Sequence, residues 1–274
     1  MLKCAGHELN LDRTRVMGIL NVTPDSFSDG GLWADKDRAL RHASEMALAG
    51  ADIIDIGGES TRPGAQDVGV EQELDRVIPV IETIVSEIGI PVSIDSSKPE
   101  VMSAAVSAGA GMINDVFALR CSGALETAAS LSVPVCIMHM QGDPREMQHN
   151  PVYHDVAGEV LDFLLTRVRA CQDAGIPSQQ IIIDPGFGFG KTLQHNIDLF
   201  RALPVFVAAG YPVLVGISRK SMLGQLTGQP IGQRLYSSLS AAVLAAQAGA
   251  SIIRVHDVAE TVDALKIVTA LQAD

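Results

Sequence analysis

The stretch VSIDSSKPE, residues 92–100, contains the unit that decides the fold. It begins with a short β-rich run and places a carboxylate, Asp95, directly after that run. Ser97, Pro99 and Glu100 then resemble a capping box with proline in the first turn, which predicts that a helix begins here. A strand, a polar residue at its carboxyl end and a helix together form one β/α unit.

The same unit recurs from one end of the chain to the other. Strands are predicted at Val16–Leu20, Ile53–Ile56, Val92–Ile94, Met112–Asn114, Val135–Met138, Ile181–Ile183, Val213–Gly216 and Ile252–Val255. Helices are predicted between them at 36–49, 71–88, 98–108, 122–131, 155–174, 193–208, 233–248 and 259–272. Eight β/α units in 274 residues, with no linker or composition break, favour a single-domain (β/α)8 TIM barrel over residues 1–274 rather than a doubly wound sheet.

Charge and composition exclude several classes of function. The formal net charge of -12 and the pI near 4.9 argue against wholesale binding to nucleic acid or to anionic membranes, which need a basic surface. Cys4, Cys121, Cys136 and Cys171 are scattered and form no CxxC pair, so we expect reduced thiols rather than a disulfide framework or a zinc site. No apolar segment predicts a membrane span or a secretory signal, and we expect a cytoplasmic protein.

Polar residues at the carboxyl ends of the strands are the candidates for the site, because the chemistry of a TIM barrel lies on the loops that follow its strands. Asp95, Asn114, Asp115 and Asp184 place several acceptors around one barrel mouth. A heteroaromatic base such as a pterin presents an amino-pyrimidinone edge that these groups can match. The alternative is that each carboxylate is structural, which requires a cation or peptide donors close to it.

Cations gather after the last two predicted strands. Residues 216–220 and 254–257 bring three basic side chains and a histidine onto adjacent loops, which is the commonest place for a phosphate in a TIM barrel. Arg254 and His256 are separated by one residue and therefore share one face of their strand. Arg219 has an alternative role, since it can point outward into a surface salt bridge.

Two long polar loops follow the first two predicted strands. Residues 21–31 combine polar side chains with glycines, and residues 55–64 combine glycines with Arg62, whose planar guanidinium is a strong donor. Both loops can be mobile parts of a site. The alternatives are ordinary surface loops and an arginine that is merely solvated.

Two other patterns do not predict the sites that they suggest at first glance. The run GFGFGKT, residues 186–192, lacks the glycine spacing of a P-loop or of GxGxxG, and glycine-lined packing against a flat ring is the better interpretation. The histidines His139, His149, His154 and His195 show no HExxH or paired-ligand spacing, so we expect no zinc.

Seven strings at different strand ends resemble the motifs of the dihydropteroate synthase family of pterin-binding TIM barrels. They are MGILNVTPDSFSDGG, GGESTRPGA, SIDSSKPEV, MHMQGDP, IIIDPGFGFGKT, GISRKSMLG and IIRVHDV. The resemblance covers the chain from about residue 15 to residue 270, with Ser96 where the family commonly has threonine. It implies a transferase that joins a dihydropterin pyrophosphate to p-aminobenzoate, releases pyrophosphate and uses Mg2+.

The resemblance also implies roles for individual residues. Asp95, Lys220 and Asp29 would be catalytic, and Asn21 would position the Mg2+. The pterin would be held by Asp95, Asn114, Met138, Asp184, Gly188, Phe189 and Lys220; the pyrophosphate by Asn21, Thr61, Arg254 and His256; and p-aminobenzoate by Phe27, Thr61, Arg62, Pro63, Phe189, Ser218 and Lys220. Sulfonamides would compete as p-aminobenzoate mimics, and the chain would form a homodimer through its outer helices.

Two rival functions fit parts of the pattern. A pterin-barrel methyltransferase shares the fold and the Asp and Asn residues but has no use for a pyrophosphate clamp, so Lys220, Arg254 and His256 count against it. A catalytically inactive pterin-binding or scaffold protein would be expected to have lost charged site residues, and this sequence retains them.

Overall fold

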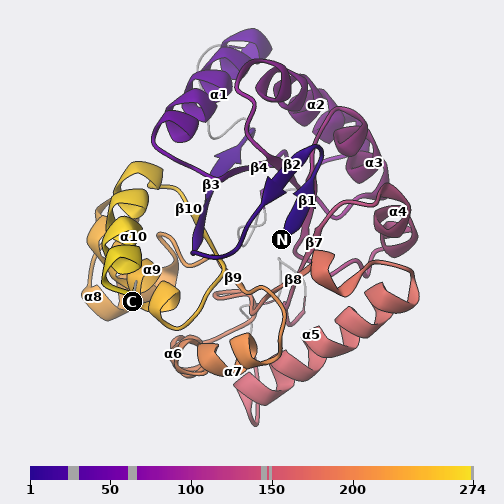
Figure 1. The fold of residues 1–274 in the computed structure, drawn as a ribbon. Helices are drawn as coiled ribbons and strands as arrows, with labels where there is room; N and C mark the ends of the chain where they lie inside the picture. Colours follow the sequence, from indigo (N-terminus) through magenta and orange to yellow (C-terminus); the bar gives the residue numbers. More distant parts are fainter. Residues whose placement is uncertain (24–30, 61–66, 143–146, 148–149, 273–274) are drawn as a thin grey trace.

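The computed structural model describes residues 1–23, 31–60, 67–142, 147 and 150–272, with the backbone alone for residues 31–35. A ring of parallel strands is surrounded by helices (Figure 1). The strands of the ring are β3 (Arg15–Asn21), β4 (Ile53–Gly57), β5 (Val92–Asp95), β6 (Met112–Asp115), β7 (Val135–Met138), β8 (Ile181–Asp184), β9 (Leu214–Val215) and β10 (Ile252–Val255). The helices are α1 (Gly31–Leu48), α2 (Val70–Glu87), α3 (Pro99–Ser107), α4 (Ala124–Leu131), α5 (Val156–Asp173), η2 (Ser178–Gln180), α6 (Leu193–Arg201), α7 (Leu203–Ala208), α8 (Ser221–Thr227), η3 (Ile231–Gln233), α9 (Leu235–Gln247) and α10 (Val258–Gln272).

The eight strands of the ring close into a barrel. Neighbouring strands pair in the order β8-β7-β6-β5-β4-β3-β10-β9. The two edge strands meet through a bridge between Ile183 and Val213, where the Ile183 amide donates to the Pro212 carbonyl over 2.9 Å. The predicted (β/α)8 barrel is therefore confirmed, and each predicted strand agrees with the observed one to within one residue at either end.

A hairpin that the sequence patterns did not predict lies across the amino-terminal end of the barrel (Figure 1). It consists of β1 (Leu2–Cys4) and β2 (His7–Leu9), joined by Ala5 and Gly6, whose φ angles of 43° and 86° suit a tight hairpin turn. Its apolar side chains join a buried layer that consists of Leu2, Cys4, Leu9, Met17, Ile53, Met112, Cys136, Ile182, Leu214 and Ile252. The hairpin seals this end, so any site must open at the carboxyl ends of the strands.

Three of the predicted helices differ from the structure. The predicted helix 36–49 begins earlier, at Gly31. The predicted helix 193–208 is two helices, α6 and α7, because Pro204 lacks an N–H and its ring would clash with the preceding turn of a continuous helix. The predicted helix 233–248 begins at Leu235, and a separate short helix, α8, precedes it. The patterns missed α8 because its seven residues, SMLGQLT, include a glycine and are too few to show helical periodicity.

The capping box predicted at Ser97 is wrong. Lys98 is the residue at the N-cap of α3, no side chain caps this helix, and Ser97 donates instead to the carboxylate of Asp115. Proline does occupy the first turn, as predicted. A capping box is found at Thr192 and His195, where each side chain accepts the backbone N–H of the other residue. His195 therefore has a structural role at the start of α6.

Candidate active site

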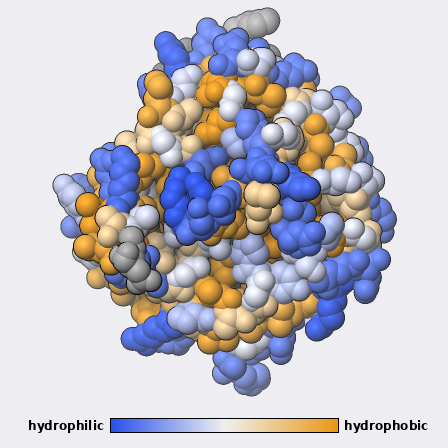
Figure 2. All heavy atoms as spheres, viewed as in Figure 1, coloured by the Kyte–Doolittle hydropathy of each residue, from blue (hydrophilic) through white to orange (hydrophobic). Residues whose placement is uncertain are grey.

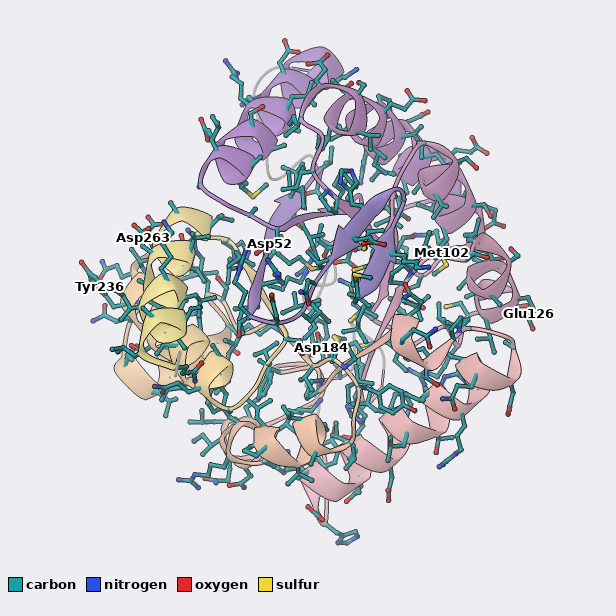
Figure 3. The ribbon with its side chains drawn as sticks, in the orientation of Figure 1. Asp52, Met102, Glu126, Asp184, Tyr236 and Asp263 are labelled. Carbon is teal, nitrogen blue, oxygen red and sulfur yellow. The ribbon has the colours of Figure 1, made fainter. Side chains whose placement is uncertain are left out.

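Three carboxylates enter the barrel mouth from three strands. Asp55 lies in β4, Asp95 ends β5 and Asp184 ends β8. Asp55 is completely buried, Asp184 is 6% exposed and Asp95 is half-buried. Figure 3 shows Asp184 near the centre of the ring of strands. Burying carboxylates together at one end of a barrel is unfavourable unless cations or hydrogen-bond donors compensate them.

Arg254, in β10, compensates two of these carboxylates at once. Its Nε lies 2.6 Å from Oδ2 of Asp55, and one terminal nitrogen lies 2.7 Å from Oδ2 of Asp95. Because β3 separates β10 from β4 in the sheet, the arginine side chain reaches across the barrel interior. Burial would lower the pKa of Arg254, but the charges of Asp55 and Asp95 outweigh it and raise this pKa above its ordinary value.

Asp95 titrates near neutral pH in this environment. Burial raises the pKa of Asp95 to about 7; Arg254 opposes the shift, and the nearby Asp55 adds to it. Near neutral pH both protonation states of the Asp95 carboxyl are therefore populated. A group that titrates in this range can change its charge during a reaction at little cost.

Asp55 is the member of this group that the sequence patterns missed. Its Oδ2 also accepts from Nδ2 of Asn114, in β6, over 3.0 Å. Because an ionised carboxylate only accepts, the amide nitrogen of Asn114 faces Asp55, and its carbonyl oxygen is turned the other way. The signal that could have found Asp55 is a carboxylate inside an otherwise apolar strand, IIDI at residues 53–56.

Lys220 lies over the loop that follows β8. It donates to the Phe187 carbonyl, and its Nζ is 4.3 Å from the centroid of the Phe189 ring. Burial lowers the pKa of Lys220 to about 8, and the charge of Asp184 opposes the shift. Burial likewise raises the pKa of Asp184, against the charge of Lys220 and a 2.7 Å hydrogen bond from the Gly186 amide. The structure thus brings the predicted residues Asp184, Phe189 and Lys220 together.

Two further predicted pterin residues belong to the same region. Gly188 has a φ of 82°, and a Cβ there would lie 3.2 Å from Cδ of Lys220, so glycine lets the lysine approach this closely. Met138, at the end of β7, packs in one apolar cluster with Val116, Met140, Met147, Phe117 and Phe189. The packing of the glycine run against a flat ring stays a prediction.

Ser218 and His256 connect the loops after β9 and β10. The Ser218 Oγ is 3.0 Å from Nδ1 of His256 and also accepts from the His256 amide over 3.2 Å. Arg219 instead points outward, with its Nε 3.0 Å from a carboxylate oxygen of Asp257. The alternative role for Arg219 in a surface salt bridge is therefore confirmed, and Arg219 does not join the cluster at the mouth.

Asn21 ends β3 beside these groups. It pairs with Gly57 of β4, which in turn pairs with Asp95 of β5. The predicted site residues Phe27, Asp29, Thr61, Arg62 and Pro63 lie outside the residues that the structure describes. Among the described residues, no group of three or more His, Cys, Asp and Glu side chains could hold a metal ion.

Asp115 is near the mouth but has a structural role. Its carboxylate accepts from the amide of Phe117 over 2.8 Å and from the amide of Leu119 over 2.7 Å. It also accepts from the hydroxyl of Ser97. The structural alternative therefore applies to Asp115, because peptide donors satisfy both oxygens and hold the turn after β6.

The sequence matches the pterin binding enzyme family over residues 17–256. The dihydropteroate synthase of Escherichia coli (strain K12) is 52% identical over 265 residues, which are 97% of this chain and 94% of the relative. The chain belongs to the dihydropteroate synthase family. The resemblance noted in the sequence motifs is therefore confirmed, and the fold agrees with it.

Solved structures of this family have closely similar folds. Two are of Xanthomonas albilineans dihydropteroate synthase: one with 4-aminobenzoic acid, at 55% identity and a TM-score of 0.95, and one in complex with 7,8-dihydropteroate, at 52% identity and a TM-score of 0.92. They cover 100% of this chain and 98% and 99% of their own chains, respectively. The Yersinia pestis enzyme with a sulfonamide drug complex is 50% identical, with a TM-score of 0.95 over 100% of this chain and 99% of that one.

Replacing Asp55 by asparagine is expected to lower the pKa of Asp95 below its value of about 7. The change removes a negative charge that raises this pKa, and it leaves Asp95 as the ion-pair partner of Arg254. Both effects favour the ionised carboxyl of Asp95. A pH titration of the Asp95 carboxyl carbon by NMR measures the shift.

Asp52→Asn is the matched control for this variant. Asp52 directly precedes β4 at the opposite end of the strand and also binds two arginines, Arg13 at 2.7 Å and Arg15 at 3.1 Å; Figure 3 labels it. This control should leave the Asp95 pKa unchanged. An Asp95 pKa that stays at its native value or rises in Asp55→Asn would contradict the network described above.

Proposed function

We propose that the chain is a transferase that condenses 6-hydroxymethyl-7,8-dihydropterin pyrophosphate with p-aminobenzoate, giving 7,8-dihydropteroate and pyrophosphate in folate biosynthesis. The observation that carries this proposal is the network of Asp55, Arg254 and Asp95 at the mouth of a barrel of the dihydropteroate synthase family. The relatives with 4-aminobenzoic acid and with 7,8-dihydropteroate support p-aminobenzoate as one substrate and 7,8-dihydropteroate as the product.

The pterin binds inside the barrel mouth through its polar edge. The carbonyl oxygen of Asn114 is turned away from Asp55 and accepts an N–H of this edge. Asp184 accepts another, since only one of its oxygens takes the Gly186 amide. The residues that hold or line the pterin are Asp95, Asn114, Met138, Asp184, Gly188, Phe189 and Lys220.

The pyrophosphate binds to Arg254 and His256. A guanidinium has several N–H groups, and Arg254 uses one to reach Asp55 and one to reach Asp95, so others are left to donate to phosphate oxygens. His256 directly follows β10, the strand that carries Arg254, and Ser218 fixes its ring. Thr61 is proposed to contribute at the same end.

Asn21 is the residue that would hold Mg2+. Its amide carbonyl is the kind of hard oxygen ligand that Mg2+ prefers, and strand pairing places it across one intervening strand, β4, from Asp95 at the mouth. Mg2+ commonly takes few protein ligands and completes its coordination with substrate phosphates and water, so a single amide fits this role. When bound, the ion would supply positive charge to the departing pyrophosphate.

p-Aminobenzoate binds next to the pterin, where Phe189 and Lys220 meet, with Ser218 contributing from the loop after β9. Phe189 and Lys220 already contact each other in the structure. Phe27, Thr61, Arg62 and Pro63 are proposed to complete this end of the site. Sulfonamides would compete here, which the Yersinia pestis relative with a sulfonamide drug supports.

The reaction is a dissociative substitution. The C–O bond between the pterin methylene and pyrophosphate breaks first, the pterin ring delocalises the resulting cation, and the amine nitrogen then forms the C–N bond and loses a proton. Ionised Asp95 stabilises the cation: a pair of unit charges 4 Å apart is worth about 4 kcal/mol at an effective dielectric of 20, roughly a thousandfold in rate. Lys220 and Asp29 are the other proposed catalytic residues, and no covalent nucleophile is needed.

The chain is further proposed to act as a cytoplasmic homodimer. Apolar side chains are exposed on two neighbouring outer helices: Tyr236 (80%) and Leu244 (55%) on α9, and Ile267 (62%) and Leu271 (81%) on α10. Figure 2 shows apolar surface on the side of the molecule where these helices lie, and Figure 3 shows Tyr236 at its outer edge. A second copy would cover this surface.

In the part of the chain that the structure describes, no helix is long and apolar enough to cross a membrane.

The purified protein, incubated with the dihydropterin pyrophosphate, p-aminobenzoate and Mg2+, is expected to form 7,8-dihydropteroate and pyrophosphate in equal amounts. Chromatography of the pterin product and an enzymatic pyrophosphate assay measure the two. An Asp95→Asn variant is the control, since it should bind pterin weakly and turn over far more slowly. No product from the native protein would overturn the proposed function.

The pH profile of kcat/KM for the pterin substrate is expected to be bell-shaped. The rate should rise as Asp95 ionises, through about pH 7, and fall as Lys220 loses its proton, above about pH 8. Steady-state rates over a range that brackets both values measure the profile. In Asp95→Asn the increase of kcat/KM on the rising limb should become smaller. An increase as large as in the native protein would assign this titration to the substrate phosphate instead of Asp95.

A further inference from the structure

Two buried polar residues, Lys191 and His139, take no part in the proposed reaction. Lys191 ends the GFGFGK run and is 3% exposed, and His139 follows β7 and is 6% exposed. The Lys191 Nζ lies 2.9 Å from the Gly186 carbonyl oxygen, 3.0 Å from the Phe189 carbonyl oxygen and 2.9 Å from Nδ1 of His139. One amino group therefore joins the loop after β7 to the loop after β8.

These hydrogen bonds form in either protonation state of the lysine. An ammonium donates all three, whereas a neutral amine donates to the two carbonyls and accepts from a protonated Nδ1 of His139. Burial lowers the pKa of His139 to about 3, so the imidazole is uncharged at neutral pH. The link between the two loops therefore does not depend on the charge of Lys191.

The backbones of the two loops are in direct contact. A Cβ at Gly186 would lie 1.9 Å from the His139 carbonyl oxygen, and a Cβ at Gly190 would lie 2.5 Å from the Gln141 carbonyl oxygen. Buried carbonyls in such closely packed loops need donors, and the Gly186 carbonyl accepts the Phe189 amide over 3.2 Å. Lys191 supplies a second donor to the Gly186 carbonyl and also donates to the Phe189 carbonyl.

A second lysine holds the same loop. Lys220 donates to the Phe187 carbonyl, and its Nζ lies over the Phe189 ring. The carbonyls of Gly186 and Phe189 bind Lys191, whereas the intervening Phe187 carbonyl binds Lys220. Both lysines therefore hold carbonyls of this loop, and Lys191 binds the carbonyl of the same residue, Phe189, whose ring meets Lys220.

We propose that Lys191 is a positioning residue for the p-aminobenzoate end of the site. By holding the carbonyls of Gly186 and Phe189, it keeps the Phe189 ring against Lys220, without touching a substrate itself. This inference rests on the proposed function, in which Phe189 and Lys220 contact p-aminobenzoate. It gives the lysine of the GFGFGK run a role unrelated to phosphate binding.

Lys191→Met tests this proposal, with Gln180→Met as the matched control. Gln180 lies immediately before β8, at the end of this strand away from the barrel mouth. Its side chain is 9% exposed and accepts the Lys3 amide of the hairpin over 3.1 Å. Each variant replaces one buried polar side chain by methionine, so both should lower the melting temperature. Only Lys191→Met should also raise the KM for p-aminobenzoate, by about tenfold, as expected for losing hydrogen bonds that orient a site.

A double-variant cycle with Phe189→Leu separates positioning from a general loss of structure. If Lys191 acts through the Phe189 ring, then Lys191→Met should change the KM for p-aminobenzoate far less when the ring is already absent. Full additivity of the two changes, or a native KM in folded Lys191→Met, would overturn the proposal. The melting temperature of each variant verifies that it is folded.

His139→Leu keeps the test decisive if Lys191→Met does not fold. It removes the imidazole that Lys191 contacts and should raise the KM for p-aminobenzoate in the same direction but by less. An unchanged KM would overturn the proposal. Failure of the proposed function gives a different result, because the native protein itself would then form no 7,8-dihydropteroate.

Discussion

The barrel mouth depends on the two ion pairs that Arg254 forms inside it. Without this arginine, Asp55 would keep only the hydrogen bond from Asn114 and Asp95 would lose its ion-pair partner, and removing one partner of a buried pair typically costs about 3–5 kcal/mol. The same side chain reaches from β10 past β3 to β4 and β5, so it ties together strands that are not neighbours. Asn114 takes its orientation from Asp55, and the pKa of Asp95 reflects both of its charged neighbours.

Burial of charge explains why this mouth is suited to chemistry as well as to binding. Burial raises the pKa of Asp95 to about 7 and lowers the pKa of Lys220 to about 8, so an acid and a base both approach neutrality. Asp184 and Arg254 limit how far these shifts go, because each lies near a group of opposite charge. The apolar barrel that stabilises the fold therefore also tunes the groups at its open end.

Much of this could be predicted from the sequence, for physical reasons. The barrel follows from apolar runs that alternate with helices, and Asp95, Asp184 and Arg254 could be found because a barrel brings the carboxyl ends of its strands to one mouth. Asp55 was missed because it lies within a strand whose other residues are core. The amino-terminal hairpin was missed because two strands of three residues show no periodicity. Ser97 binds a carboxylate that is 18 residues away in the sequence, a pairing that no local capping pattern contains.

The most direct test of the central claim is a crystal structure of the protein with 7,8-dihydropteroate bound. We expect the pterin edge within hydrogen-bonding distance of the Asn114 carbonyl oxygen and the Asp184 carboxylate, with Arg254 still paired to Asp55 and Asp95. A pterin bound away from the barrel mouth, or an Arg254 side chain that has left both carboxylates in the complex, would contradict the claim that this buried network organises the site.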